Sequence, residues 1–440
     1  MTVSDVRPIA PALEPLSGSV RVPGSKSISN RALVLAALAR GSSVLTGVLR
    51  SDDTDSLLNA IRSLGIGVRA DGDTVEIDGA AGRPASTGAA CRIECGHGGT
   101  PARFLLALGC LSPDSVTIDG SSRLRARPMM DGIEMLRTLG ADIVCLEEEG
   151  RLPIRIDSSG LRGGSLRLGA TASSQFISAL LLIAPFLEEG IEIEFSDPPT
   201  SESYLHLTIA ELQHWGVGVE FESESDALRW IRIRPGMVAS RDRAVEPDAS
   251  SAVYWAVASA IVPGSAITLL ECRPGDPQPD ARVIEAIGLT GAAVEHGDDG
   301  ITVRGPRSVR GWNSIDASRM PDGAVAMSIL AACALTATTI TGLETLPLKE
   351  SDRIGVLKRE LERCGAEVIA TSGSLRIGPI PSPQLVPDAP PISIPTYEDH
   401  RMAMAFSILG LRRGGIVIED PRCVSKSYPR FFDDLDRLRG

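Results

Sequence analysis

The sequence of 440 residues is poor in aromatic side chains, which make up 4% of it, and it holds only five histidines. Proteins that bind single-stranded nucleic acids need rings on which bases stack, so this class is disfavoured. Basic residues are not in excess either, because the formal net charge is −12, which repels nucleic acid and anionic membranes. The histidines show no close ligand spacing, so no metal site is predicted. An anionic ligand would therefore need a local cluster of Lys and Arg.

Paired cysteine motifs are also missing. The eight cysteines are scattered without a C-x-x-C pair, and several lie in apolar runs such as residues 331–334. This is typical of reduced cysteines that pack as small hydrophobic side chains, and it predicts a cytoplasmic protein. No signal peptide is expected, because the start lacks a basic segment followed by an apolar block. The uncharged stretches 168–187 and 323–343 are diluted by Gly, Ser, Thr or Gln. We predict a buried helix for the first and a buried helix leading into a strand for the second, not membrane spans.

A recurring unit at a spacing of about 75 residues organises the chain. Each repeat has a Ser/Asp/Thr-rich turn, an Ala/Leu-rich helix, a strand, and a second amphipathic helix that ends near a Gly. Glycine stops a helix well because it accepts the left-handed conformation. Phrases such as SLGIGV (63–68) and TLGADI (138–143) mark these ends. The six first helices are predicted to begin near Ser27, Thr100, Ser174, Ser250, Asp322 and Asp399.

The sixth repeat stops at Gly440, where the other copies turn into their last strands. A strand-like segment at residues 9–22 precedes the first repeat, and we expect it to complete the last one. Alternating helices and strands predict an α/β fold. We expect an N-terminal lobe of repeats 1–3 over residues 23–242, and a C-terminal lobe of repeats 4–6 over 1–22 plus 243–440. No G-x-G-x-x-G pattern follows a first strand, so no dinucleotide cofactor is indicated.

The first motif that could carry chemistry is PGSKSISNR at residues 23–31. A helix that starts here would place free N–H groups beside Lys26, which makes an anion site. Arg31 lies one turn beyond Ser27 on the same face. The spacing differs from a P-loop, because one residue separates the Gly from the Lys. A capped surface helix is the alternative reading.

Further motifs stand at or near other helix starts: GHGGTPAR (96–103), RLRARP (123–128), TASSQ (171–175), MPDG (320–323), LKESDR (348–353), EDHRMAM (398–404) and SKSYP (425–429). Each could be an ordinary cap or a solvated turn. Together they occupy equivalent positions of the repeat, so we expect them to converge on one cleft. Such a cleft would suit a ligand with several negative charges, because it would hold Lys26, Arg31, Arg127, Lys349, Arg353, Arg401 and Lys426. The acids best placed for acid/base chemistry are Asp322 and Glu350.

The order PGSKSISNRAL, GGT with a following Arg, RARP, SSQF, PD, LKESDR, EDHRMAM, SKSYP resembles the 5-enolpyruvylshikimate-3-phosphate synthase family, the 3-phosphoshikimate 1-carboxyvinyltransferases. The resemblance covers nearly the whole chain. It implies a two-lobed enolpyruvyl transferase-like fold of six βαβαββ units, three per lobe. It also implies a transferase of the shikimate pathway, which leads to chorismate and the aromatic amino acids. The expected reaction moves the enolpyruvyl group of phosphoenolpyruvate to the 5-hydroxyl of shikimate 3-phosphate and releases phosphate.

The resemblance further implies a monomer without a cofactor, whose partners are the two small-molecule substrates. Shikimate 3-phosphate would contact Lys26, Ser27, Arg31, Ser173, Ser174, Gln175, Ser201, Asp322 and Lys349. Phosphoenolpyruvate would contact Lys26, Gly99, Arg127, Gln175, Arg353, Arg401 and Lys426. Asp322 would accept the hydroxyl proton, and Glu350, with Lys26, would protonate the methylene carbon. The cations would stabilise the tetrahedral intermediate, and closure of the lobes would expel water.

Three positions depart from the family pattern and bear on the phosphoenolpyruvate pocket and on sensitivity to glyphosate. His97 with Gly98 replaces a small or amide pair, Phe104 stands where Pro is common, and Thr345 stands where Asn is often found.

Two other functions stay open. The sister transferase that acts on UDP-N-acetylglucosamine shares the repeat, but it normally carries a reactive Cys in a Gly-rich loop, and the RARP segment here has none. A non-catalytic anion-binding protein could use the same cations. It would not need Asp322 and Glu350, which argues against it.

Overall fold

The computed structural model describes residues 5–157, 160–224, 227–381 and 386–440. The chain divides into an N-terminal lobe, Gly24–Glu246, and a C-terminal lobe that combines Met1–Pro23 with Pro247–Gly440. Each lobe has its own hydrophobic core, and the chain before residue 24 packs with the core of the C-terminal lobe. The two segments that precede and follow the N-terminal lobe therefore share one folding unit.

The N-terminal lobe contains three repeats. The first comprises α1 (Lys26–Leu38), β3 (Arg40–Thr46), α2 (Asp52–Ser63), β4 (Gly67–Asp71), β5 (Thr74–Ala80) and the distant β14 (Arg243–Ala244). The second comprises β6 (Cys91–Glu94), α3 (Gly99–Gly109), β7 (Val116–Asp119), α4 (Ser122–Arg125), α5 (Met130–Thr138), β8 (Ile143–Cys145) and β9 (Ile154–Ile156). The third comprises β10 (Gly164–Leu168), α6 (Ser174–Ile183), η1 (Ala184–Phe186), β11 (Ile191–Phe195), α7 (Ser203–His214), β12 (Val219–Glu224) and β13 (Ala227–Ile233).

The C-terminal lobe contains the other three repeats. The fourth comprises β2 (Ser17–Val20), α8 (Ala249–Ile261), β15 (Ala266–Leu270), α9 (Ala281–Ile287), η2 (Gly288–Thr290), β16 (Ala293–Gly297) and β17 (Gly300–Arg304). The fifth comprises β18 (Ser314–Asp316), α10 (Ala324–Cys333), β19 (Thr338–Thr341), η3 (Leu346–Leu348), α11 (Arg353–Arg363), β20 (Val368–Ala370) and β21 (Leu375–Ile377). The sixth comprises β22 (Ile392–Ile394), α12 (His400–Gly410), β23 (Ile416–Glu419), η5 (Pro421–Lys426), α13 (Phe431–Arg439) and β1 (Val6–Pro8).

The described residues form one sheet per repeat, with the same connection pattern. In the second repeat the order is β6-β7-β9-β8, in which β6 and β7 are parallel and β9 is antiparallel to both of its neighbours. Parallel strands need a crossover, which α3 supplies, whereas the antiparallel pair is a hairpin. This pattern confirms the predicted α/β fold of six βαβαββ units, three per lobe.

The N-terminal segment differs from the prediction. We expected residues 9–22 to complete the sixth repeat, but β2 within this segment pairs in parallel with β15 of the fourth repeat. The sixth sheet is completed instead by β1, which pairs antiparallel with β23. The strand that closes the sixth repeat therefore lies just before the predicted segment. An exposed edge of β23 can be covered by any extended chain nearby, and β1 is the chain that arrives there.

The lobe boundaries also differ from the expected residue numbers. We expected them after residues 22 and 242, and the structure divides after Pro23 and after Glu246. The later second boundary has a clear cause, because β14 pairs in parallel with β3 and so supplies the first strand of the first repeat. In this way each crossing segment contributes a strand to the sheet that it joins.

Helix limits follow the sequence signals closely. The six first helices, α1, α3, α6, α8, α10 and α12, begin within two residues of their predicted starts. The glycines after α2, α5, α7, α9 and α11 have φ angles between 79° and 102°, the left-handed region that ends helices. These are Gly65, Gly140, Gly216, Gly291 and Gly365.

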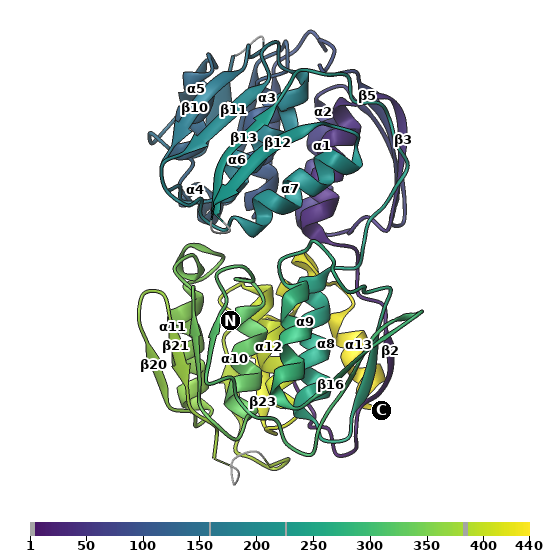
Figure 1. Ribbon diagram of the computed structural model, residues 1–440, viewed down its shortest axis with the longest axis vertical. Coiled ribbons are helices and arrows are strands. Elements are labelled where there is room, and N and C mark those ends of the chain that lie inside the picture. Colours follow the sequence, from purple (N-terminus) through teal and green to yellow (C-terminus); the bar gives the residue numbers. More distant parts are fainter. Residues whose placement is uncertain (1–4, 158–159, 225–226, 382–385) are drawn as a thin grey trace. The chain divides into compact units, whose positions relative to one another are not determined.

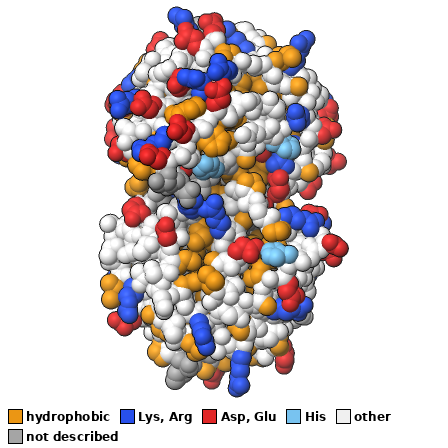
Figure 2. Space-filling view, viewed as in Figure 1, with side chains coloured by type: hydrophobic (Ala, Val, Ile, Leu, Met, Phe, Trp, Pro, Cys, Tyr) orange, Lys and Arg blue, Asp and Glu red, His pale blue; other side chains and the backbone are white. Residues whose placement is uncertain are grey.

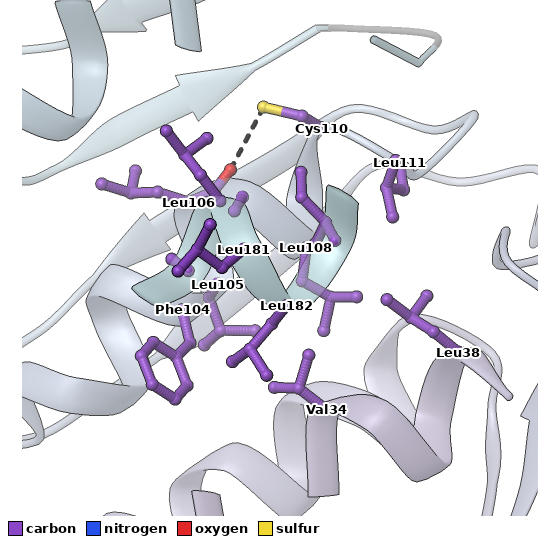
Figure 3. Close-up of a cluster of buried hydrophobic side chains, with 14 of the residues drawn as sticks. Val34, Leu38, Phe104, Leu105, Leu106, Leu108, Cys110, Leu111, Leu181 and Leu182 are labelled. Atoms are coloured by element: carbon purple, nitrogen blue, oxygen red, sulfur yellow. Dashed lines mark hydrogen bonds between the residues drawn. The ribbon is translucent and has the colours of Figure 1, made fainter. Parts of the chain in front are cut away.

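The first helices of each lobe form its centre. In the C-terminal lobe α8, α10 and α12 contact one another, and α9 lies against α8 (Figure 1). In the N-terminal lobe α1, α3 and α6 pack together through side chains such as Val34, Phe104 and Leu181 (Figure 3). Charged side chains of both signs lie on the visible surface of each lobe (Figure 2). Within the described ranges, no helix combines the length and the apolar character that crossing a bilayer requires.

Candidate active site

The densest group of charges lies in the C-terminal lobe, around the guanidinium of Arg353 at the start of α11. This side chain is 1% exposed. Its Nε donates to Asp399 Oδ2 at 2.9 Å, and its η nitrogens donate to Asp322 Oδ1 and Glu350 Oε2, each at 2.8 Å. Burial alone would lower the pKa of Arg353, but these three carboxylates raise it. One arginine thus ties together the starts of α10, α11 and α12, which bidentate and branched guanidinium bonding suits well.

Asp322 lies just before α10 and is surrounded by cations. Besides Arg353, its carboxylate contacts Arg401 Nη2 at 3.1 Å and Lys349 Nζ at 3.5 Å. Burial would raise the pKa of Asp322, but attraction to Arg401, Lys349 and Arg353 outweighs it and holds the pKa well below its usual value. Asp322 is therefore ionised at neutral pH, as a proton acceptor must be.

Glu350 is the second acid of this group. Its Oε2 accepts from Arg353, and its Oε1 lies 3.1 Å from Lys426 Nζ at the end of η5. Asp399 is fully buried as the N-cap of α12, where it accepts from the amide of Arg401 at 3.0 Å. We call the set Asp322, Lys349, Glu350, Arg353, Asp399, Arg401 and Lys426 the charge cluster. It brings together the six residues of this lobe that the sequence predicted, and it adds Asp399.

In the N-terminal lobe the predicted residues form smaller groups. Lys26 opens α1, which Ser25 caps, and its Nζ lies 3.5 Å from Oδ2 of the buried Asp53. The next residue, Ser27, accepts from Arg31 Nη1 through its carbonyl at 2.8 Å. Asp53 had not been predicted. It is one of several acids at the start of α2, where they read as ordinary first-turn residues.

Arg31 is buried and bonded to neutral acceptors rather than to carboxylates. Its Nε donates to Thr208 Oγ1 at 2.8 Å, and its Nη2 lies within hydrogen-bond distance of Ser178 Oγ and the carbonyl of Tyr204. Burial is the main cause that lowers the pKa of Arg31 to about 10. The side chain also lies over the ring of Phe104, 5.6 Å from its centroid. This departure from the family pattern is a core residue that touches a predicted ligand.

A third group surrounds Gln175 at the start of α6. Its Oε1 accepts from Arg103 at 2.8 Å, and its Nε2 donates to Thr100 Oγ1 at 3.0 Å. Ser173 caps the helix by accepting from the amide of Gln175, and it also lies 3.3 Å from Arg103. Ser174 is buried in the first turn. Arg103 was visible in the GGT motif but had been assigned no role.

Gly99 and Arg127 belong to another close approach. A Cβ on Gly99 would lie 2.4 Å from Arg127 Nη1, so the absence of a side chain lets the guanidinium rest against the backbone. His97, two residues earlier, shares a hydrogen bond of 2.9 Å with Ser121, the N-cap of α4.

Two predicted positions stand at turns. Ser201 has a positive φ of 50° just before α7, and its carbonyl accepts from the amide of Tyr204 at 3.0 Å. Thr345 precedes η3, which leads to Lys349. In the described part of the chain, we find no group of three His, Cys, Asp or Glu side chains that could hold a metal ion.

An α/β fold of six repeats with a buried cluster of alternating cations and carboxylates defines a class of proteins that handle multiply anionic small molecules. Residues 11–435 match the model of the family described as EPSP synthase (3-phosphoshikimate 1-carboxyvinyltransferase). The chain therefore belongs to the EPSP synthase family.

Individual relatives agree with this assignment. The chain is 35% identical to 3-phosphoshikimate 1-carboxyvinyltransferase 2 of Halalkalibacterium halodurans, over 97% of this chain and 93% of that protein. It is 36% identical to the 3-phosphoshikimate 1-carboxyvinyltransferase of Methanoculleus marisnigri, over 96% of both chains. A solved structure of EPSP synthase from Acinetobacter baumannii superimposes with a TM-score of 0.80 and 28% identity, and the match covers 98% of this chain and 97% of that one.

Proposed function

We propose that this chain transfers the enolpyruvyl group of phosphoenolpyruvate to the 5-hydroxyl of shikimate 3-phosphate and releases phosphate. Family membership supports the reaction, and the charge cluster is the observation that carries it. Both substrates bear several negative charges, and the cluster offers Lys349, Arg353, Arg401 and Lys426 in a largely buried setting. Electrostatic attraction is stronger where water is excluded, so such cations bind anions and stabilise charged intermediates.

The two acids of the cluster suit the two proton transfers of the reaction. Asp322, ionised and held by cations, accepts the proton of the 5-hydroxyl as its oxygen attacks C2 of the enolpyruvyl group. Glu350, with Lys26, supplies a proton to the methylene carbon, which yields a tetrahedral intermediate. Removal of a proton from the new methyl group then restores the double bond as the C–O bond to phosphate breaks. A group that donates in one step and accepts in the next leaves the enzyme unchanged overall.

The low pKa of Asp322 makes it a weak base in the free protein, because its cations hold the carboxylate strongly. Substrate anions that bind Lys349 and Arg401 compete for these cations. Less positive charge then acts on Asp322, so its pKa rises toward the range in which it abstracts a proton effectively. The substrates thus activate the base by binding beside it.

In the N-terminal lobe we assign the hydroxyl and amide groups to shikimate 3-phosphate: Ser27, Ser173, Ser174, Gln175 and Ser201, with Lys26 and Arg31. Asp322 and Lys349 of the other lobe contact the same substrate. Phosphoenolpyruvate is assigned to Lys26, Gly99, Arg127, Gln175, Arg353, Arg401 and Lys426. Support for these roles comes from the starts of α1, α3 and α6, where free backbone N–H groups attract phosphate.

We also propose a cytoplasmic monomer that works without a cofactor. All eight cysteines are free thiols, as expected of a protein in a reducing compartment. Light scattering on the purified chain, across a range of concentrations, measures the oligomeric state directly.

One assay tests the reaction. Phosphate release is measured with both substrates together and with each omitted in turn, and the expected release requires both. Release that requires UDP-N-acetylglucosamine in place of shikimate 3-phosphate would select the sister transferase. Tight binding of both substrates without any phosphate release would indicate a non-catalytic anion-binding protein.

A further inference from the structure

A second carboxylate lies behind Asp322 and belongs to a different repeat. Asp280 precedes α9 and is 1% exposed. Its Oδ1 accepts from the amide of Gly323 at 3.0 Å, and its Oδ2 accepts from the hydroxyl of Ser250 in the first turn of α8. Gly323 directly follows Asp322. The buried carboxylate therefore connects the main chain beside the proposed base to the helix start of the preceding repeat.

The contact with Gly323 is close on every side. A Cβ at this position would lie 2.6 Å from a methyl carbon of Val283 in α9 and 3.2 Å from Asp280 Oδ1. The residue is therefore wedged between α9 and the start of α10, and its amide points at one acceptor. Since φ and ψ of Gly323 set the direction in which Asp322 leaves the helix, any loss of this bond loosens Asp322.

We infer that Asp280 is a positioning residue for the proposed base Asp322, acting through the amide of Gly323 and held in turn by Ser250. The inference rests on the proposed function for its catalytic consequence. Asp322 must hold three cations and also reach the hydroxyl of the substrate. A displacement on the order of 1 Å at such a base costs about 100-fold in rate. A buried acceptor with two fixed donors is a rigid way to prevent it.

The charge of Asp280 has a second consequence. Burial is the main cause that raises the pKa of Asp280 to about 6, and repulsion by Asp322 adds to it, whereas Arg401 opposes it. A buried carboxylate beside a base is costly, so a residue with a purely structural task would be served by a neutral side chain. The position is instead occupied by an acceptor whose negative charge opposes the cations around Asp322.

The first test separates holding from folding by hydrogen exchange. Asp280→Ala removes the acceptor, while Asp280→Asn keeps an oxygen that can accept from the Gly323 amide. We expect faster exchange of the Gly323 amide in Asp280→Ala and near wild-type exchange in Asp280→Asn. Unchanged protection of Gly323 in Asp280→Ala would overturn the inference. This measurement does not depend on the activity of the chain.

The second test is kinetic. We expect Asp280→Ala to lower kcat about 100-fold, with KM for both substrates changed less, and Asp280→Asn to recover most of that loss. In an Asp322→Asn background, Asp280→Ala should cause no further loss, because the group that it positions is already disabled. An equal additional loss in both backgrounds would contradict positioning and indicate a general effect on folding.

A matched pair of serines on α8 serves as the control. Ser250 donates to Asp280, whereas Ser259 donates to the carbonyl of Val303 at 2.6 Å in the core. Ser250→Ala should lower kcat about 5-fold, a smaller loss than Asp280→Ala causes, because one bond to Asp280 remains. Ser259→Ala should lower Tm without changing kcat. Equal kcat values for both serine variants would overturn the chain of contacts. Wild-type protein without substrate-dependent phosphate release would instead refute the proposed function, with the exchange result still valid.

Discussion

The two lobes hold their arginines in opposite ways. Arg353 of the C-terminal lobe is buried among three carboxylates, which raise its pKa. Arg31 of the N-terminal lobe is equally buried, but hydroxyl and carbonyl groups surround it, and burial lowers its pKa to about 10. The first arginine balances charge, whereas the second orders a polar surface. Two similar sets of repeats thus carry different chemistry at their helix starts.

The largest expected effect falls on the acids of the charge cluster. Asp322→Asn and Glu350→Gln remove the proposed proton acceptor and donor, while their shapes stay nearly the same. Each should lower kcat about 1,000-fold, because general acid and base groups contribute factors of this order. Steady-state phosphate release measures the loss, and circular dichroism checks the fold. Near wild-type turnover in both variants would show that these acids are not the catalytic groups.

Stability should differ between the two arginines. Arg353→Ala leaves the buried Asp399 without its guanidinium partner, which costs about 3–5 kcal/mol of unfolding free energy. Arg31→Ala leaves neutral acceptors unpaired, and we expect a smaller loss of about 1–3 kcal/mol. Urea unfolding of each variant measures the difference. If Arg31→Ala proved the more destabilising, the contrast between a charge-balanced and a neutral setting would not explain the stability of the lobes.

The pH dependence of stability should change when Asp280 is replaced. The pKa of Asp280 is raised to about 6 in the folded chain, by burial first and by Asp322 second, while Arg401 partly offsets both. A raised carboxyl pKa favours the folded state at low pH, and this contribution is lost as pH rises from about 4 to above 6. Asp280→Asn should therefore become more stable relative to wild type over this interval. A difference in unfolding free energy that stays constant from pH 4 to pH 7 would contradict the shift.

The smallest effect concerns Gly99. In Gly99→Ala the new methyl group would displace the guanidinium of Arg127, which lies at the flexible end of its side chain. Stability should hardly change, while KM for phosphoenolpyruvate should rise about 10-fold, a cost of about 1.4 kcal/mol. Gly218→Ala is the control, because no atom lies within 4 Å of its Cβ position. Equal KM values for both variants would separate Arg127 from the phosphoenolpyruvate site.

Local signals predicted much of the fold. Ser and Asp caps marked the starts of the six first helices, and glycines in the left-handed conformation marked the ends of the second ones. Both signals depend on neighbouring residues along the chain, so the sequence carries them directly. The partners of β1, β2 and β14 could not be predicted in the same way, because each pairs with a strand more than 190 residues away.

The candidate site divides along the same line. The order of the motifs pointed to every residue of the charge cluster except Asp399, which stood in the EDHRMAM motif without a role. Asp53, Arg103 and Asp280 had no distinguishing pattern, since an acid or an arginine at a helix start looks like a cap or a surface charge.

The sequence by itself determined the repeats, the helix limits and the set of charged groups at the helix starts. Only the tertiary structure decided which strand completes which sheet, and which carboxylate faces which cation. The physical reason is that caps and glycine turns are local, whereas strand pairing and ion pairing join groups that meet only when the repeats pack. Asp280 shows this most clearly, because its task depends on Gly323, 43 residues further along the chain.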